Sequence, residues 1–184
     1  MAIEDKRVRR TKKLLRQALA ELMREKEFKN ITVSDVVRRA DINRGTFYVY
    51  YRDVYDLREK VENEMVDTLR GTIEAVLPEV VAQASMRPVI EQAVRYLEEN
   101  HDLAFVLLRD NGVGSFEDKL MALMEECSRQ LKPPKNEADQ FPIWFVAAGC
   151  IGLLKKLMMQ PVPTARDEVL DRLDDLLCRI LQTA

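Results

Sequence analysis

Apolar residues recur every three or four positions along most of this chain, which places them on one face of a helix. Residues 6–26 carry such a stripe behind a basic start, and two shorter helical segments follow before residue 52. A helix of roughly 24 residues is predicted from Val54 to just before Pro78. The remaining patterns cover residues 88–99, 102–110, 114–131, 140–159 and 165–182. No segment alternates convincingly as a strand would, so the sequence predicts an all-α fold of about nine helices.

The two short segments are separated by a turn. Thr32, followed three residues later by Asp35, has the spacing of a capping box and opens a helix that ends near Ala40. The "DIN" sequence reads as the turn, and Asn43 can cap the next helix. Gly45, near the start of that helix, lets its backbone approach another surface closely. Two short helices joined by a three-residue turn and preceded by a longer helix predict a helix-turn-helix.

Charge is distributed unevenly along the chain. Residues 1–60 contain 16 Lys and Arg against 10 Asp and Glu, a net charge of +6, whereas residues 61–184 carry a net charge of −8. The basic side chains of the first helix stand at the end where the helix dipole is already positive, which favours an external anion. This division of charge is typical of a polyanion-binding module joined to a second domain. The alternative explanation is a charged surface that is simply solvated.

Four aromatic side chains crowd into residues 47–51. At 100° per residue, Phe47 and Tyr51 share a helix face with Ile42 and should point into the small three-helix core. Tyr48 and Tyr50 lie outside that face, with Tyr50 nearest its edge. A tyrosine hydroxyl can donate to a phosphate or meet a base edge, so this helix combines a core face with an outward binding face.

The segment from about Lys12 to Met65 resembles the DNA-binding domain of the TetR family of bacterial transcriptional regulators. The family pattern has a T-V-x-D/E-I-A-x-x-A-G-V-S helix and turn, followed by x-G-T-[FL]-Y-x-H-F-x-x-K-x-x-L. The chain reads TVSDVVRRADINRGTFYVYYRDVYDL, and it matches at Thr32, Val33, Asp35, Ala40, Gly45, Thr46, Phe47, Tyr48, Asp53 and Leu57. The resemblance implies binding to a palindromic double-stranded DNA operator through Ser34, Arg44, Gly45, Thr46, Tyr48 and Tyr50.

Two positions depart from the family pattern. Tyr50 stands where the family has a histidine, and Val54 stands where a lysine that touches phosphate begins the next helix. A tyrosine can still donate to a phosphate, but a valine cannot. We expect Arg52 or the basic N-terminal arm to replace some of the lost contact.

The resemblance implies two domains, a DNA-binding domain at residues 1–52 and a helical dimerisation and effector domain at residues 53–184. Residues 141–154 form an uncharged run that is shorter than the ~20 residues of a membrane-spanning helix, so we expect a buried helix and no membrane. Family members pair through their last two helices, and two recognition helices about 34–36 Å apart can then read one palindrome. The alternative is that these helices fill the core of one protomer. The expected dimer contacts are Ala148, Gly149, Gly152, Val169, Leu173, Leu176 and Ile180.

Family members also carry an effector pocket in the second domain. Candidate lining residues are Tyr96, His101, Phe105 and Trp144, together with Arg109, Phe116 and Met121. Aromatic residues and methionines at helical spacing fill cores more often than they line pockets. The effector, a small molecule or a protein, is left open.

The chemistry of an enzyme is not apparent in the chain. It has one histidine, no nucleophile spaced from a base, no glycine-rich phosphate loop and no cluster of metal ligands, so we expect no cofactor or metal. Its three cysteines fit no metal-ligand spacing and are expected to be reduced. The charged N-terminus lacks a signal-peptide core, which favours the cytoplasm. The predicted function is a dimeric, effector-controlled repressor, and the alternative is a helical protein that acts mainly through a protein partner.

Overall fold

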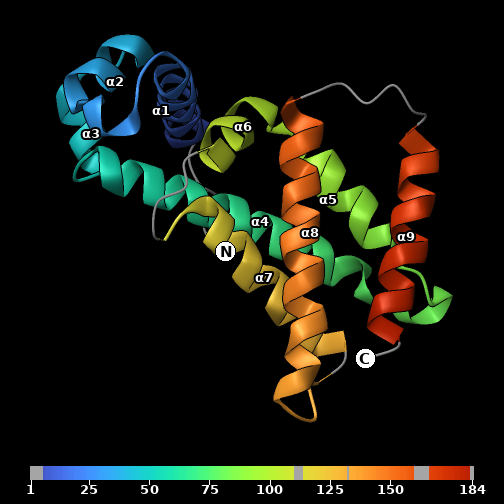
Figure 1. Ribbon diagram of the computed structural model, residues 1–184. Helices are drawn as coiled ribbons and strands as arrows, with labels where there is room; N and C mark the ends of the chain where they lie inside the picture. Colours follow the sequence, from blue (N-terminus) through green and yellow to red (C-terminus); the bar gives the residue numbers. More distant parts are fainter. Residues whose placement is uncertain (1–5, 110–113, 132, 160–165, 183–184) are drawn as a thin grey trace. The chain divides into compact units, whose positions relative to one another are not determined.

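The structure is a computed structural model that describes residues 6–109, 114–131, 133–159 and 166–182. Within these residues the chain forms nine α-helices and two short 3-10 helices, and no strand, which confirms the predicted all-α fold (Figure 1). The chain divides into two compact units, Met1–Glu64 and Met65–Ala184. The division falls within the fourth helix, whereas the sequence placed it after residue 52.

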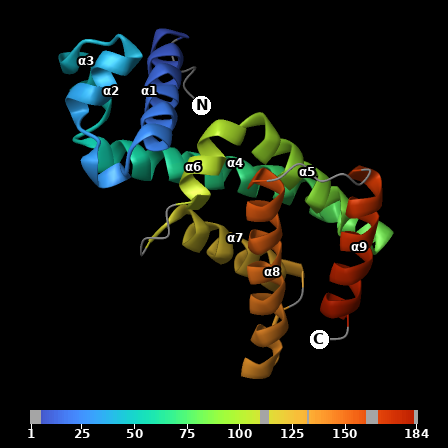
Figure 2. The ribbon, with the colours of Figure 1, turned by 45° about the horizontal axis from the view of Figure 1, so that its top comes forward.

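The N-terminal unit contains α1 (Lys6–Glu25), the 3-10 helix η1 (Phe28–Asn30), α2 (Val33–Ala40), α3 (Arg44–Tyr50) and the start of α4 (Val54–Gln83). The second helix packs against both the first and the third, as Figures 1 and 2 show from two directions. Apolar side chains from all four α-helices are fully buried and form one core: Leu15, Leu19, Val36, Phe47, Leu57 and Val61.

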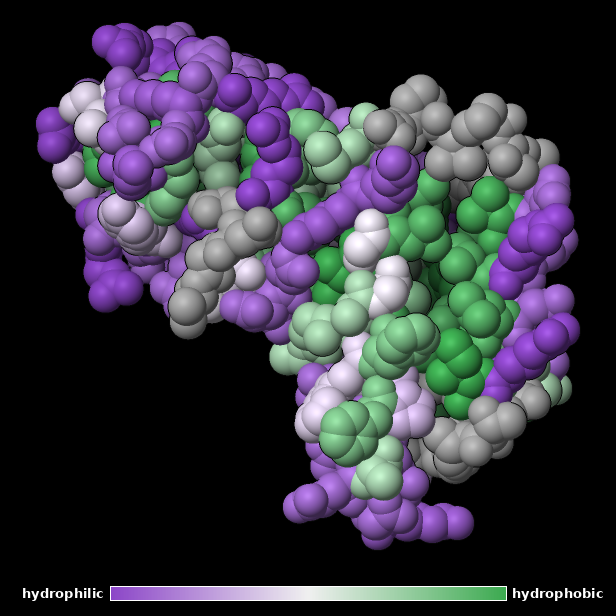
Figure 3. All heavy atoms as spheres, viewed as in Figure 1, coloured by the Kyte–Doolittle hydropathy of each residue, from purple (hydrophilic) through white to green (hydrophobic). Residues whose placement is uncertain are grey.

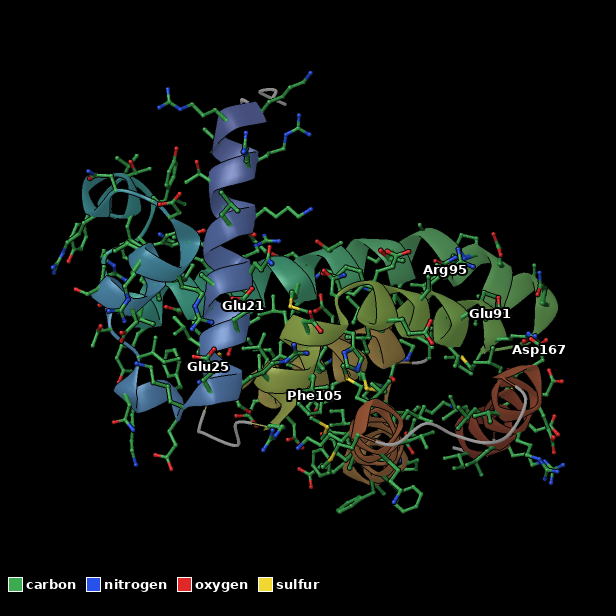
Figure 4. The ribbon with its side chains drawn as sticks, turned by 90° about the horizontal axis from the view of Figure 1, so that it is seen from above. Glu21, Glu25, Glu91, Arg95, Phe105 and Asp167 are labelled. Carbon is green, nitrogen blue, oxygen red and sulfur yellow. The ribbon has the colours of Figure 1, made fainter. Side chains whose placement is uncertain are left out.

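Ion pairs at the surface also join the first two helices. Arg39 on α2 donates to Glu21 at 3.2 Å and to Glu25 at 2.7 Å, and Figure 4 labels these two glutamates one turn apart on α1. The hydrogen bond from Arg39 lowers the pKa of Glu25, and the same carboxylates raise the pKa of Arg39. These contacts fix which side of α1 faces the helix-turn-helix.

The fourth helix is longer than its sequence pattern predicts. It runs for 30 residues and contains Pro78, where we expected it to stop. Proline removes one N–H from the helix ladder, but Val80 beyond it is buried, with 6% of its surface exposed. The helix ends before Ala84, whose φ of 50° is left-handed. The helix therefore continues past the proline, and of its last residues Val80 is buried while Val81, Ala82 and Gln83 are exposed.

The C-terminal unit adds α5 (Arg87–Glu99), α6 (His101–Arg109), α7 (Phe116–Leu131), the 3-10 helix η2 (Glu137–Asp139), α8 (Gln140–Met159) and α9 (Arg166–Gln182). The eighth helix packs against α6, α7 and α9, and α9 also packs against α5. Figures 1 and 2 show α8 and α9 side by side. A core cluster joins α5, α8 and α9 through Ile90, Val146, Leu170 and Leu177.

A polar clasp, formed by Asp174 and Arg87, fixes α9 to the start of α5. Asp174 accepts hydrogen bonds from the backbone N–H groups of Met86 at 2.6 Å and Arg87 at 3.1 Å. Arg87 in turn donates to Glu91 on its own helix and to Asp167 on α9, at 2.7 and 3.0 Å. Glu91 and Asp167 lie near one another in Figure 4. The carboxylate of Asp174 thus caps the N-terminus of α5, where no residue of α5 itself does.

The outer face of α8 is exposed, so the prediction of a buried helix is wrong for this face. The buried residues of α8 are Ile143, Val146, Ala147 and Ile151. Phe145 is 71% exposed. Within the described residues, one stretch, Glu137–Met159, is long and apolar enough to cross a membrane by length and composition alone, and 22% of its apolar window is buried. Among the described residues, part of the apolar surface of α8 is therefore left exposed.

Candidate DNA-binding site

The first helix of the helix-turn-helix begins at the predicted capping box. The Thr32 hydroxyl accepts from the backbone N–H of Asp35 at 3.2 Å, and the Asp35 carboxylate accepts from the backbone N–H of Thr32 at 3.0 Å. Lys26 also donates to that carboxylate at 2.7 Å. The lysine and the threonine together hold the pKa of Asp35 well below its usual range. This network fixes where α2 starts.

The turn between α2 and α3 depends on two backbone features. Asp41 adopts a left-handed φ of 53°, and the backbone N–H of Ile42 donates to the carbonyl of Val37 at 3.0 Å. The side chain of Asn43 then accepts from the backbone N–H of Gly45 at 2.7 Å, which confirms the predicted cap. A Cβ at Gly45 would lie 3.1 Å from that capping oxygen. Glycine therefore keeps the cap compact as well as leaving the helix start open.

The third helix has the predicted inner and outer faces. Phe47 is fully buried and Tyr51 is 3% exposed, whereas Tyr48 is 48% exposed. Arg44 and Gly45 are also exposed, and Thr46 and Tyr50 are half-buried. The rings of Phe47 and Tyr48 meet edge to face, with centroids 5.6 Å apart. The buried ring thereby supports the outward one.

Arg44 brings three of the predicted DNA-binding residues together. Its guanidinium donates to the hydroxyl of Tyr48 at 3.1 Å and to the hydroxyl of Ser34 on α2 at 3.5 Å. The same group lies 5.6 Å from the centroid of the Tyr48 ring. The arginine is therefore oriented between the two helices, and its charge lies on the exposed face of the helix-turn-helix.

A second cationic group lies where α3 meets α4. Asp56, which is 5% exposed, accepts from the backbone N–H of Arg52 at 2.9 Å, from its guanidinium at 3.2 Å and from Lys60 at 3.0 Å. The backbone donor and the lysine lower the pKa of Asp56. Lys60 also donates to the carbonyl of Tyr50 at 3.0 Å. Two cations thus share one buried carboxylate beside the end of α3.

Both parts of the chain match known sequence families. Residues 15–61 match the family described as bacterial regulatory proteins, tetR family, and residues 84–178 match a transcriptional regulator C-terminal region of the TetR type. The second match alone covers more than half of the chain. The chain belongs to the TetR family.

Individual relatives agree with the TetR assignment. The uncharacterized HTH-type transcriptional regulator YxbF of Bacillus subtilis (strain 168) is 39% identical over 55 residues, which are 30% of this chain and 14% of YxbF. The dihydroxyacetone kinase operon activator DhaS has 20% identity and a TM-score of 0.60 over 94% of both chains. The fatty acid degradation regulator FadR from Bacillus halodurans has 14% identity and a TM-score of 0.62 over 96% of this chain and 97% of that one. The two structural likenesses show the TetR fold.

The departure at Val54 has a structural reason. In place of the TetR lysine, the valine side chain is 4% exposed and belongs to the core of the N-terminal unit. Lys60 places its ammonium group against the last turn of α3 instead. Lys60 is not among the predicted DNA-binding residues, although its i,i+4 spacing from Asp56 is visible in the sequence. Its contact with Tyr50 depends on the packing of α4 against α3.

The predicted effector residues do not share one site. His101 is exposed and stacks on Phe105 with centroids 5.9 Å apart, and Tyr96 is half-buried. Trp144 is 41% exposed and meets Phe141 edge to face. None of these four residues lines the apolar cavity of the C-terminal unit, although Phe105 and Arg109 border a separate hollow of about 210 Å³.

Other chemistry is sparse in the described part of the chain. There, no group of three or more His, Cys, Asp or Glu side chains is placed to hold a metal ion. The three cysteines are free. The exposed face of the helix-turn-helix is therefore the best-defined candidate site.

Proposed function

We propose that this protein is a sequence-specific DNA-binding transcriptional regulator, acting in the cytoplasm as a homodimeric repressor under the control of an effector. The observation that carries the proposal is the orientation of Arg44 between Ser34 and Tyr48 on the exposed face of the helix-turn-helix. Membership of the TetR family supports the same reading.

The proposed DNA surface divides into base-reading and phosphate-contacting groups. Arg44 is suited to guanine, because its fork can donate two hydrogen bonds to one base edge. Tyr48 offers a hydroxyl and a ring edge beside it. Phosphate contacts are assigned to the hydroxyl of Ser34 and to the cations Arg52 and Lys60, because such contacts orient a protein on the duplex without reading sequence.

The basic start of α1 supplies further positive charge. In the described part of this helix the first turn contains no acidic residue, and Arg9, Arg10 and Lys13 are exposed. Cations at a helix N-terminus destabilise the helix slightly, so their presence is better explained by an anionic partner than by folding. This arm is proposed to add contacts to the DNA backbone.

Dimerisation is proposed to use the exposed face of α8 together with α9. Ala148, Gly149 and Gly152 are exposed, and a Cβ added to either glycine would meet no atom within 4 Å. Leu176 on α9 is 52% exposed. Of the other predicted contacts, Leu173 and Ile180 also pack on the core of their own protomer, so they serve the fold as well.

Effector control is proposed to pass through α4. This helix is continuous from Val54, in the N-terminal unit, to Gln83 in the C-terminal unit. Its later turns contribute Leu69, Ile73 and Leu77 to the apolar cavity. A ligand that displaces these turns could therefore alter the placement of the first turn of α4, which carries Asp56 and its two cations.

A gel-shift titration with the DNA upstream of the protein's own gene tests the proposal. With six to ten phosphate contacts, affinity should fall roughly 10³- to 10⁵-fold between 50 and 200 mM salt. Arg44→Ala should weaken binding to the selected site by roughly 1–3 kcal/mol, while Arg95→Ala, an exposed arginine on α5, should leave it unchanged. Equal losses for both variants, or no preference among DNA fragments, would refute the proposal.

The burial of Val54 at the position of the family lysine favours one alternative, a protein that acts mainly through a protein partner. In that case a purified partner would bind with fixed stoichiometry, and no DNA fragment would be selected. Lys60→Met separates the two cases. If Lys60 contacts a phosphate, this substitution should reduce the slope of log affinity against log salt by about one.

A further inference from the structure

A cavity of about 140 Å³, partly open to the surface, lies in the C-terminal unit. Five helices, α4, α5, α7, α8 and α9, contribute to its lining, which includes Ile73, Leu97, Leu123, Ile151 and Leu177. Figure 3 shows strongly apolar side chains in the hollow between α8 and α9. The cavity is thus built by the whole unit rather than by one loop.

Among the described residues that line the cavity, none has a charged side chain. Its polar groups are the hydroxyl of Ser128 and the thiols of Cys127 and Cys150. Burial raises the pKa of both thiols, so they are neutral at physiological pH. One hydroxyl and two weakly polar thiols offer few hydrogen bonds to a ligand.

Glu126 and Lys155, each next to a lining residue in the sequence, are already paired. Glu126 accepts a hydrogen bond from Arg70, and Lys155 donates to Glu117. A carboxylate or ammonium group placed in the cavity would therefore lose its water without gaining a counter-charge. Such transfer of an uncompensated charge is strongly unfavourable.

We propose that the cavity binds an uncharged, apolar molecule of about the size of one aromatic ring or a six-carbon chain. The class rests on the lining, and the size rests on the volume, since an apolar cavity of about 150 Å³ in another protein stays dry and takes up benzene. The inference deepens the proposed function, because it names the chemical class of the effector.

The proposal has a quantitative signature. Each methylene group moved from water into an apolar site contributes about 0.8 kcal/mol, which corresponds to about fourfold in affinity. The affinity of linear alcohols should therefore rise about fourfold per carbon from butanol to hexanol and then level off as the cavity fills. Hexanoate should bind at least about 100-fold more weakly than hexanol, because its charge must be buried.

Isothermal titration calorimetry of the full-length protein without DNA tests these values, using butanol, pentanol, hexanol, toluene and hexanoate. Burial of apolar surface should give a negative heat-capacity change for the neutral probes. Saturable binding with the methylene increments supports the proposal. Failure of every neutral probe to bind, or hexanoate binding as tightly as hexanol, overturns it.

A pair of matched variants locates the binding. Ala93→Met fills the cavity from α5 and should abolish binding of hexanol, while Ala122→Met, on the exposed face of α7, should leave it unchanged. Should Ala93→Met fail to fold, Ser128→Leu fills the cavity from α7 with the same expectation. Unchanged binding in a folded cavity-filling variant overturns the assignment of the site.

The two proposals fail separately. The calorimetric titration is carried out without DNA. Absence of operator binding in the gel shift would therefore refute the proposed regulator function without affecting the proposed ligand class of the cavity. Loss of probe binding with intact, salt-dependent operator binding would refute only the ligand class.

Discussion

The glycines of α8 give a prediction that distinguishes a dimer contact from a free surface. Gly149 and Gly152 lie within a helix, are exposed and have open space where a Cβ would stand. Gly71 in α4 has the same three properties. Replacing an exposed glycine inside a helix by alanine stabilises the helix by about 1 kcal/mol. Judged on the protomer alone, all three Gly→Ala changes should therefore stabilise the protein equally.

A dimer through α8 changes this expectation for Gly149→Ala and Gly152→Ala. An added methyl in a closely packed contact costs about 1–3 kcal/mol. In a symmetric dimer each change occurs twice, so the dissociation constant should rise at least about 30-fold, which corresponds to about 2 kcal/mol. Gly71→Ala should leave dissociation unaffected.

Sedimentation equilibrium over a range of protein concentrations measures the dissociation constant, and urea unfolding at low concentration measures the stability of the protomer. The expected outcome is a more stable protomer for all three variants and a weaker dimer for the two α8 variants alone. If the α8 variants dimerise as tightly as Gly71→Ala, or if the wild-type protein is a monomer, the assignment of this face is wrong.

Three further predictions concern stability. Thr32→Ala removes the cap of α2 and should cost about 1 kcal/mol in urea unfolding, whereas Thr32→Ser should cost much less. The folded-state pKa of Asp35 is lowered, so its carboxylate stabilises the fold fully above the unfolded pKa of about 3.9, and this stabilisation is lost as pH falls further. The urea concentration at the unfolding midpoint should therefore decrease when the pH is lowered below about 4. Asp35→Asn should make this decrease smaller. Asp174→Ala removes the acceptor of the Met86 N–H and one of the two acceptors of the Arg87 N–H, the other being Ser85 Oγ at 3.2 Å. It should cost about 1.5–3 kcal/mol in thermal or urea unfolding, with faster hydrogen exchange at Met86 as the local readout.

Elements with a strong local signal could be predicted from the sequence. The helical period located every α-helix in the described residues, and the Thr32–Asp35 spacing and Asn43 identified two caps that the structure contains. The angular argument separated Phe47 from Tyr48 because a seven-residue helix has one inner side. Both caps are formed by residues no more than four positions apart, and the inner face of α3 follows from the helical period.

Features that depend on distant residues could not be predicted. The continuation of α4 through Pro78 runs against the local preference of the proline, and the carboxylate that caps α5 comes from Asp174, which lies 88 residues from Met86. The cavity lining draws on five helices, each of whose apolar residues looks like ordinary core. Its composition became meaningful only when the helices were placed together.

The two faces of α3 separate the packing of this helix from the DNA recognition proposed for it. Phe47 and Tyr51 are buried and carry the packing of this helix, while Val49 is 73% exposed and contributes little to it. Exposed substitutions away from caps and cores usually change stability by no more than about 0.5 kcal/mol. If α3 reads DNA as proposed, point mutations on its outer face would shift the preferred operator in single steps without unfolding the protein, so that a duplicated copy of this gene would acquire new target promoters on an unchanged scaffold.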